Sequence, residues 1–161
     1  MAFGSASKIF RNFLKDCHDR TTSALDLDTD VPKIALYGNS GTPDQNATAV
    51  LSAYNGAASA WVTANEITDT NWAAGGRALT GITTHFADTA GILWYDASDT
   101  AGAGNVTVAN VYGVLCYDDT ITTPQADIGM SYHAFTTQPA GVTAGTFTVV
   151  WDVNGIFRYT L

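Results

Sequence analysis

The chain has 161 residues, of which 46% are hydrophobic and only 14% are charged. A typical soluble domain carries about 25% charged residues, so this chain is poor in charge. Fifteen acidic and seven basic side chains give a formal net charge of −8 at pH 7. Binding to nucleic-acid phosphates or to anionic membranes depends on clustered lysine and arginine, so this balance argues against both kinds of partner.

The charge is unevenly distributed along the chain. Residues 1–33 carry five basic and five acidic side chains, whereas residues 34–161 carry two basic and ten acidic ones. The N-terminal segment is therefore chemically distinct from the rest. We predict two units: an N-terminal helix with an acidic loop over residues 1–31, and a β-sandwich body over residues 32–161.

No targeting or membrane segment is expected. Residues 1–7 lack a charged stretch followed by an apolar one, so the sequence does not predict a cleaved signal peptide. The longest uncharged stretch, residues 128–151, is too rich in threonine, serine and glycine to form a membrane helix. Cys17 and Cys116 share no metal or redox spacing, which predicts two free thiols in a protein that folds in a reducing cytoplasm.

One amphipathic helix is predicted near the N-terminus. Ser7 can cap a helix that begins at Lys8 and ends near Asp19. The apolar side chains that recur on one face at helical spacing are Ile9, Phe10, Phe13, Leu14 and Cys17. A second, alanine-rich stretch over residues 48–60 predicts at most a helical turn or two, since Asn55-Gly56 interrupts it.

Short strand-like runs follow one another from Pro32 to the end of the chain. Each run is apolar or β-branched and is bounded by turn-forming residues. The predicted strands cover residues 33–37, 91–95, 106–109, 111–117, 128–135, 146–151 and 156–161. The last two are joined through Asn154-Gly155, which predicts a terminal hairpin that ties Leu161 into the sheet.

This order of elements predicts the fold class. Many short strands with glycine-rich turns and a single leading helix are typical of an antiparallel β fold. We expect a mainly β protein with a single β-sandwich, jelly-roll or Ig-like, preceded by one N-terminal amphipathic α-helix.

We expect no enzyme, because the common catalytic motifs are missing. The sequence contains no HExxH, GxSxG, GxxxxGKS/T or GxGxxG pattern. Its single glutamate, Glu66, has no evident carboxylate partner for glycoside hydrolysis. His18, His85 and His133 lack ligand spacing and are interpreted as structural residues. We assign no catalytic, cofactor-binding or metal-binding residue.

The alternating acids of residues 26–30 resemble a calcium-binding pattern only in part. Val31 and Tyr37 stand where an EF-hand needs glycine and glutamate. We interpret this stretch as an acidic loop before a strand that Pro32 stiffens, with a calcium site of another kind as the alternative.

The apolar face of the predicted helix has to be covered by something. The chain's own sandwich is one candidate, and a neighbouring subunit is the other. As the hypothesis to be tested, we take Ile9, Phe10, Phe13 and Leu14 as contacts in an assembly.

Several short segments follow one another in a specific order along most of the chain. They are LDLDTD (25–30) with KIALY (33–37), NEIT (65–68) with AAGGRAL (73–79), YDDT (117–120), AGTFT (144–148) and WDVNGIF (151–157). In this order they resemble a group of small β-rich structural proteins of tailed-bacteriophage virions. The resemblance covers the chain from about Phe10 onward, and it implies no catalytic residues.

The resemblance implies a role in a phage particle. An acidic protein is repelled by packaged DNA, so the outer surface of the capsid, or the tail, is the expected place. We expect a capsid decoration (cement) protein that folds in the host cytoplasm. Its partners would be the major capsid protein, copies of itself as a homo-oligomer, or both, with many repeated contacts adding avidity.

Two alternatives stay open from the sequence. A tail or head–tail joining protein is also structural, but it would be present in only a few copies per particle. A carbohydrate-binding module on the virion surface is an alternative of another class, in which exposed Trp61, Trp72 and Trp94 would stack on sugars. Burial of these side chains in the core is the competing interpretation.

Overall fold

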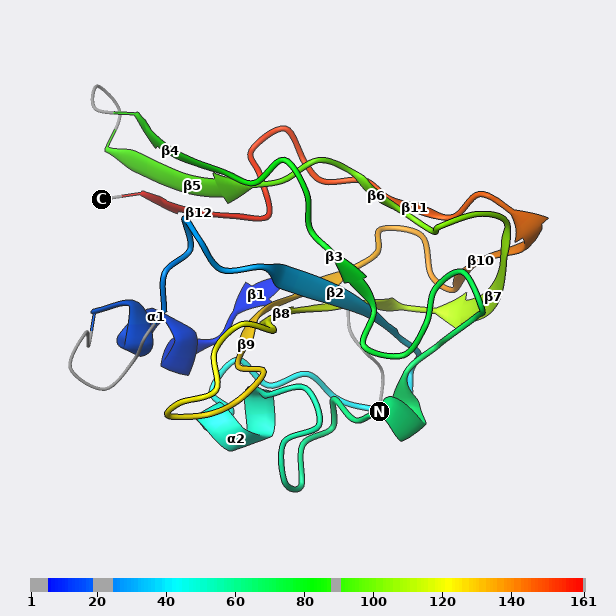
Figure 1. The fold of residues 1–161 in the computed structure, drawn as a ribbon, viewed down its shortest axis with the longest axis horizontal. Helices are drawn as coiled ribbons and strands as arrows, with labels where there is room; N and C mark the ends of the chain where they lie inside the picture. Colours follow the sequence, from blue (N-terminus) through cyan, green and yellow to red (C-terminus); the bar gives the residue numbers. More distant parts are fainter. Residues whose placement is uncertain (1–5, 19–24, 88–90, 161) are drawn as a thin grey trace.

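The computed structural model describes residues 6–18, 25–87 and 91–160, and these form a mainly β protein (Figure 1). The helical elements are α1 (Arg11–His18), α2 (Ala49–Ser52) and the 3-10 helix η1 (Thr63–Asn65). The strands are β1 (Lys8–Ile9), β2 (Pro32–Tyr37), β3 (Arg77–Ala78), β4 (Thr83–Ala87), β5 (Ile92–Asp96), β6 (Thr100–Ala101), β7 (Val106–Val111), β8 (Gly113–Asp118), β9 (Gly129–Ala134), β10 (Ala140–Gly145), β11 (Thr148–Val149) and β12 (Phe157–Thr160). The predicted fold class, mainly β, is confirmed.

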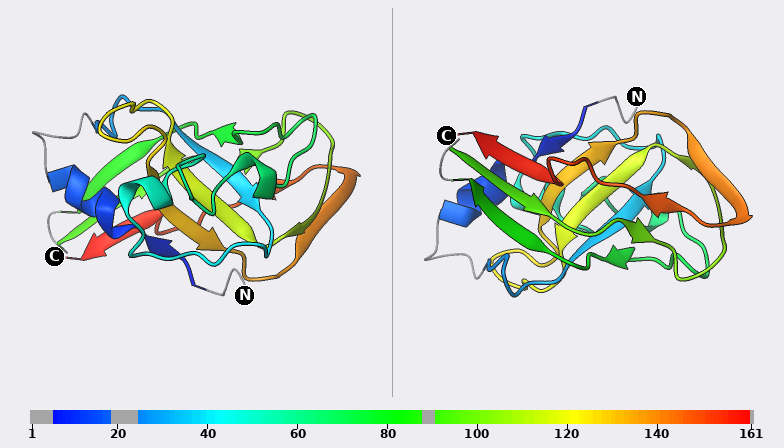
Figure 2. Two further views of the ribbon diagram at one scale, coloured as in Figure 1. Left: turned by 90° about the horizontal axis from the view of Figure 1, so that it is seen from below. Right: turned by 90° about the horizontal axis from the view of Figure 1, so that it is seen from above.

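The strands lie in two layers (Figure 1). One layer is a five-stranded antiparallel sheet in the order β1-β9-β8-β2-β3, and the other contains the three-stranded sheet β12-β5-β4 and the pair β11-β6. The pair β10-β7 forms one end of the molecule, and α1 lies at the other (Figure 2). The finer description as a jelly-roll or Ig-like sandwich stays a prediction.

Strands β2 and β8 form the centre of the core. All six residues of β8 are buried, as are five of the six in β2. Their near-continuous apolar sequences are typical of strands that are covered on both faces. In the second layer, the ring of Phe157 stacks on that of its β5 partner Tyr95 at 5.1 Å and meets the ring of Phe13 on α1 edge-on at 5.7 Å. These side chains belong to the same hydrophobic cluster as those of β2 and β8, so both layers share one core.

The N-terminal segment packs on the chain's own sheets, which is the first of the two candidates for covering its apolar side chains. Lys8–Ile9 pairs with β9 as an edge strand, and α1 begins only at Arg11. Ser7 does not cap the helix, because its hydroxyl accepts a hydrogen bond from the N–H of Ala134 at 3.2 Å. Pairing with the sheet edge thus replaces the first predicted helical turn. The predicted helix end near Asp19 lies outside the described residues.

The four predicted assembly contacts divide into two groups. Phe10 and Phe13 are 0% exposed, because the chain's own core covers them. The ring of Phe10 meets those of Tyr132 and Trp61 at 5.4 and 6.2 Å. These two phenylalanines are therefore core residues and present no surface to a neighbour. Ile9 and Leu14 are half-buried and pack against the same core.

The predicted terminal hairpin is wrong, although its turn is present. Within the described residues β11 pairs with β6, whereas β12 pairs with β5. Between them, the N–H of Gly155 donates to the carbonyl of Asp152 at 2.8 Å, and the N–H of Ile156 then donates to the carbonyl of Tyr95. The chain therefore turns and crosses to a different strand. The end of the prediction, Leu161, lies outside the described residues.

The short helix predicted in the alanine-rich stretch is present as α2. Thr48 caps it, and its hydroxyl accepts a hydrogen bond from the N–H of Leu51 at 3.4 Å. After α2, the backbone of Gly56 lies close to that of Val50. A Cβ on residue 56 would lie 2.0 Å from the carbonyl oxygen of Val50. A residue with a side chain would force the two segments apart.

Candidate functional site

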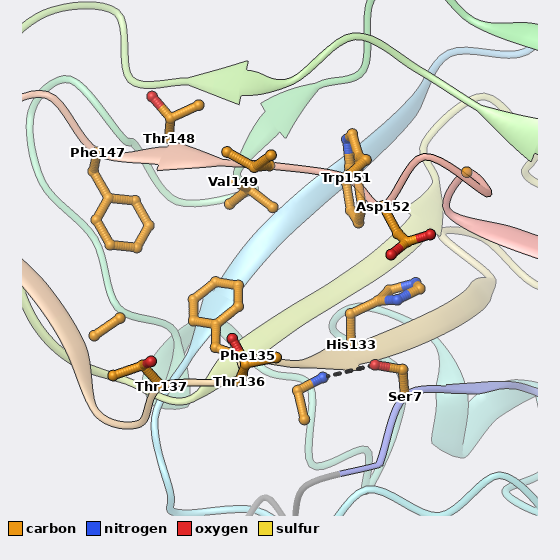
Figure 3. A pocket seen from close by; sticks show the side chains of 14 residues that line it. Ser7, His133, Phe135, Thr136, Thr137, Phe147, Thr148, Val149, Trp151 and Asp152 are labelled. Atoms are coloured by element: carbon orange, nitrogen blue, oxygen red, sulfur yellow. Dashed lines mark hydrogen bonds between the residues drawn. The ribbon is translucent and has the colours of Figure 1, made fainter.

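A groove opens where the end of β9 faces the segment around β11 (Figure 3). Its volume is about 630 Å³, within the range of roughly 300–1,000 Å³ that small-ligand sites occupy. Two chain segments supply most of the lining, residues 133–137 and residues 147–152, and Ser7, Ala140 and Gly155 complete it.

Backbone contacts fix both walls of the groove. On one side, Phe135 follows the last residue of β9, and its N–H donates to the carbonyl of Tyr112 at 3.0 Å. On the other side, the N–H of Trp151 donates to Oδ1 of Asp99 at 3.0 Å. The wall positions are therefore set by hydrogen bonds to elements outside the groove, and they do not depend on a bound ligand.

His133 lies at the polar end of the groove, below Trp151 and Asp152 (Figure 3). Its Nε2 is 2.8 Å from Oγ of Ser131, and its ring meets that of Trp151 at 5.3 Å and 76°. Loss of contact with water lowers the pKa of His133 to about 4. The imidazole is therefore neutral at physiological pH and adds no positive charge to the groove.

The Ser131–His133 pair has the atoms of a nucleophile and its base, but its geometry does not suit hydrolysis. A catalytic serine must reach the substrate, whereas Ser131 is fully buried in β9, between strands β1 and β8. The hydroxyl also contacts Cys116 in the core. Within the described ranges, no three His, Cys, Asp or Glu side chains lie together as a metal site would require.

Glu66 is a structural anchor in the core. It is buried, accepts a hydrogen bond from the hydroxyl of Tyr54 at 2.8 Å, and accepts another from the N–H of Gly75 at 3.1 Å. Burial raises the pKa of its carboxyl group, and these hydrogen bonds oppose the rise. The contacts join Tyr54, just after α2, to the loop before β3, and leave Glu66 no access to a substrate.

The carboxylates of residues 26–30 do not form a cluster that could hold a metal ion in the described part of the chain. The carboxylate of Asp30 accepts the N–H of Asp26 at 2.7 Å, and Oδ1 of Asp26 accepts the N–H of Asp28 at 3.2 Å. These are contacts within a turn, as the acidic-loop interpretation predicts. Asp30 alone is buried among these acids, and its carboxyl group lies against that of Asp118.

Asp30 and Asp118 form a buried pair of carboxyl groups at the end of β8. Oδ1 of Asp118 accepts the N–H groups of Thr120 and Ile121 at 2.8 and 3.3 Å. Its Oδ2 is buried and has no donor among the described residues. The two carboxyl groups are within hydrogen-bonding range, so a proton on one of them would satisfy this atom. Burial, reinforced by Asp30, raises the pKa of Asp118 to about 6, although the two N–H groups oppose the rise.

The tryptophans that the sequence suggested for sugar stacking do not form a site. Trp61 and Trp72 are buried at 4% and 0% exposure, so the competing interpretation as core residues holds for them. Trp94 is half-buried in β5. The groove instead uses Trp151, which sequence reasoning had placed only in a strand.

The helices in the described part of the chain are all too short or too polar to cross a membrane. No family model, curated protein or solved structure matches this chain. The resemblance to phage structural proteins therefore rests on the residues of the chain alone.

Proposed function

We propose that this chain is a structural protein of a tailed-bacteriophage virion, and within the particle a capsid decoration protein on the outer surface. Its partners would be the major capsid protein, further copies of the chain, or both. The order of the resembling segments and the net charge of −8 support this role, since that charge disfavours contact with packaged DNA. The role requires a surface that can bind a protein lattice.

The observation that carries the proposal is the exposed apolar loop between β11 and β12. Val150 and Val153 are 69% and 93% exposed, the highest values among the large hydrophobic residues in the described part of the chain. Burying such side chains against a neighbour removes apolar surface from water, at about 25 cal/mol per Å². The proposed contact surface is therefore this loop and not the predicted helix face of Ile9, Phe10, Phe13 and Leu14.

The loop is also held rigidly, which favours binding. Oδ1 of Asp152 accepts both the N–H and the side-chain amide of Asn154, at 2.8 and 2.7 Å. Arg158 of β12 donates to Oδ1 of Asn154 at 2.9 Å and ties the turn to the sheet. A loop that is already ordered loses little conformational entropy when it is covered. Repeated over a lattice, even a weak contact of this kind gives strong attachment.

Quantitative protein gels of purified virions test the role. A decoration protein is present in hundreds of copies, in proportion to the major capsid protein. A tail or head–tail joining protein is present in a handful, and that result would replace the proposal by the second hypothesis. Absence of the chain from purified particles would overturn both.

Replacing Val150 and Val153 together by serine should weaken attachment to particles that lack the chain by at least tenfold, because the apolar area buried on contact is lost. Thermal unfolding should stay nearly unchanged, since both side chains face water. Val50→Ser is the matched control, because Val50 is exposed on α2, away from the loop. Unchanged attachment of the double variant in co-sedimentation would refute the loop as the contact surface.

A further inference from the structure

The groove beside the exposed loop has an apolar end and a polar end (Figure 3). Phe135 and Phe147 lie at the apolar end, with their ring centroids 6.2 Å apart. His133 and Asp152 lie at the polar end, where Trp151 stands above the imidazole (Figure 3). A ligand that fits this groove therefore has both an apolar face and hydrogen-bonding groups.

The charge of the lining restricts the ligand further. Among the described residues that line the groove, none is lysine or arginine. The hydrogen bonds from Asn154 lower the pKa of Asp152, so its carboxylate is ionised at neutral pH, whereas the imidazole of His133 is neutral. Phosphates, sulfates and carboxylates would meet this negative charge, and Arg158, whose charge also lowers the pKa of Asp152, lies outside the lining, where it donates to Asn154. An anionic ligand is thereby disfavoured.

The remaining polar groups suit a ligand that is rich in hydroxyls. Thr136, Thr137 and Thr148 are exposed at the rim, and each hydroxyl can both donate and accept. A carboxylate such as that of Asp152 accepts strong hydrogen bonds from hydroxyl donors. Sugars combine such hydroxyls with an apolar C–H face that packs on aromatic rings.

We propose that this groove binds a neutral saccharide, with the apolar face of a sugar ring against Trp151 and Phe135. Sugar hydroxyls donate to the carboxylate of Asp152 and exchange hydrogen bonds with the rim threonines. The site differs from the one that the sequence suggested, since it contains none of Trp61, Trp72 and Trp94. The saccharide site does not rest on the role in the virion, although Val150, a proposed lattice contact, also lines the groove.

A glycan array that holds neutral, sialylated and sulfated saccharides, probed with the labelled full-length protein, tests the proposal. We expect binding to neutral glycans, with affinities that isothermal titration with the best array glycan then measures. Binding restricted to sialylated or sulfated glycans, or to none, would overturn the proposal. Aromatic rings beside a carboxylate also suit organic cations. Saturation by tetramethylammonium without any glycan binding would therefore overturn it as well.

Two variants locate the binding in the groove. Trp151→Ala should weaken glycan binding at least tenfold by removing the stacking surface, and Asp152→Asn should weaken it severalfold by removing the charged acceptor. Asp152→Asn guards against a folding defect in the first variant, because Asp152 is exposed and the amide oxygen still accepts from Asn154. Val153→Ser, on the same loop but outside the groove lining, should bind as the unaltered protein does. Glycan binding that survives both groove variants would place the site elsewhere and refute the proposal.

Discussion

Replacing Asp118 by asparagine is expected to raise the free energy of unfolding at pH 8 by about 2–3 kcal/mol, and to change it little near pH 4. The pKa of Asp118 is raised from its ordinary value of 3.8 to about 6 in the folded protein. A pKa difference of one corresponds to about 1.4 kcal/mol, so ionisation of this buried group costs about 3 kcal/mol of stability. Asparagine carries no charge at any pH and removes this cost.

The sign of the pH dependence follows from proton binding. Between pH 3.8 and about 6, the folded state holds a proton on Asp118 that the unfolded state has released. The associated stability is fully present below pH 3.8 and is lost as the pH rises through 6. His133, whose pKa is lowered in the folded protein, acts in the opposite direction. At acid pH the unfolded state binds a proton on this imidazole more readily than the folded state does, so acid favours unfolding. This effect is common to both proteins, so the difference between them isolates Asp118.

Asparagine also preserves the geometry of the pair. Its carbonyl oxygen can accept the N–H groups of Thr120 and Ile121, as Oδ1 of Asp118 does. Its amide nitrogen takes the place of Oδ2, the buried atom that has no donor, and can donate to the carboxylate of Asp30. The other titratable groups near the pair, Tyr95 and Cys116, have raised pKa values and stay neutral over this range.

Urea unfolding followed by tryptophan fluorescence at several pH values measures the effect. Asp119→Asn is the matched control: Asp119 is the next residue, but it is partly exposed and pairs with Lys33 at 2.6 Å. Loss of a surface pair changes stability by about 1 kcal/mol or less, so the control should retain the pH dependence of the unaltered protein. If Asp118→Asn is instead the less stable protein at pH 8, the ionised carboxylate is stabilised by its N–H donors and no proton is shared.

Apolar runs in the sequence were sufficient to find most of the strands, because their pattern is local. The run at 111–117 coincides with β8 to within two residues, and the run at 128–135 coincides with β9. The partner of a strand is not a local property. The turn at Asn154-Gly155 forms as predicted, but Gly155 has a φ of 82° and approaches the backbone of Tyr95 closely. After this turn the N–H of Ile156 donates to the carbonyl of Tyr95, and β12 pairs with β5 and not with β11.

The groove could not be predicted in the same way, because its walls come from separate parts of the chain. Ser7 and Ala134, which share a hydrogen bond at its rim, are 127 residues apart in sequence. Composition alone also does not distinguish a core tryptophan from one at a surface. Trp72 is fully buried, whereas Trp151 lines the groove, and neither is marked by its neighbours in sequence.

Replacing Phe10 by alanine is expected to lower the free energy of unfolding by about 3–5 kcal/mol, the usual cost of removing a buried phenylalanine side chain. Phe10 is 0% exposed, and its ring packs on those of Tyr132 and Trp61. It also approaches Gly129, where a Cβ would lie 2.9 Å from Cε2 of the ring, so few atoms could move into the space that is left. The free energy of unfolding of a typical domain is about 5–15 kcal/mol, so this variant would lose a large part of its stability.

The same urea unfolding measures this loss, with Val153→Ala as the control. Val153 is 93% exposed, and its truncation should change stability by no more than about 0.5 kcal/mol. If Phe10→Ala were as stable as the control and attached weakly to virions, the predicted helix face that contains Phe10 would be an assembly contact after all. If it is strongly destabilised, weak attachment of this variant says nothing about the contact surface. Only a variant that stays folded, such as the double replacement of Val150 and Val153, can then locate that surface.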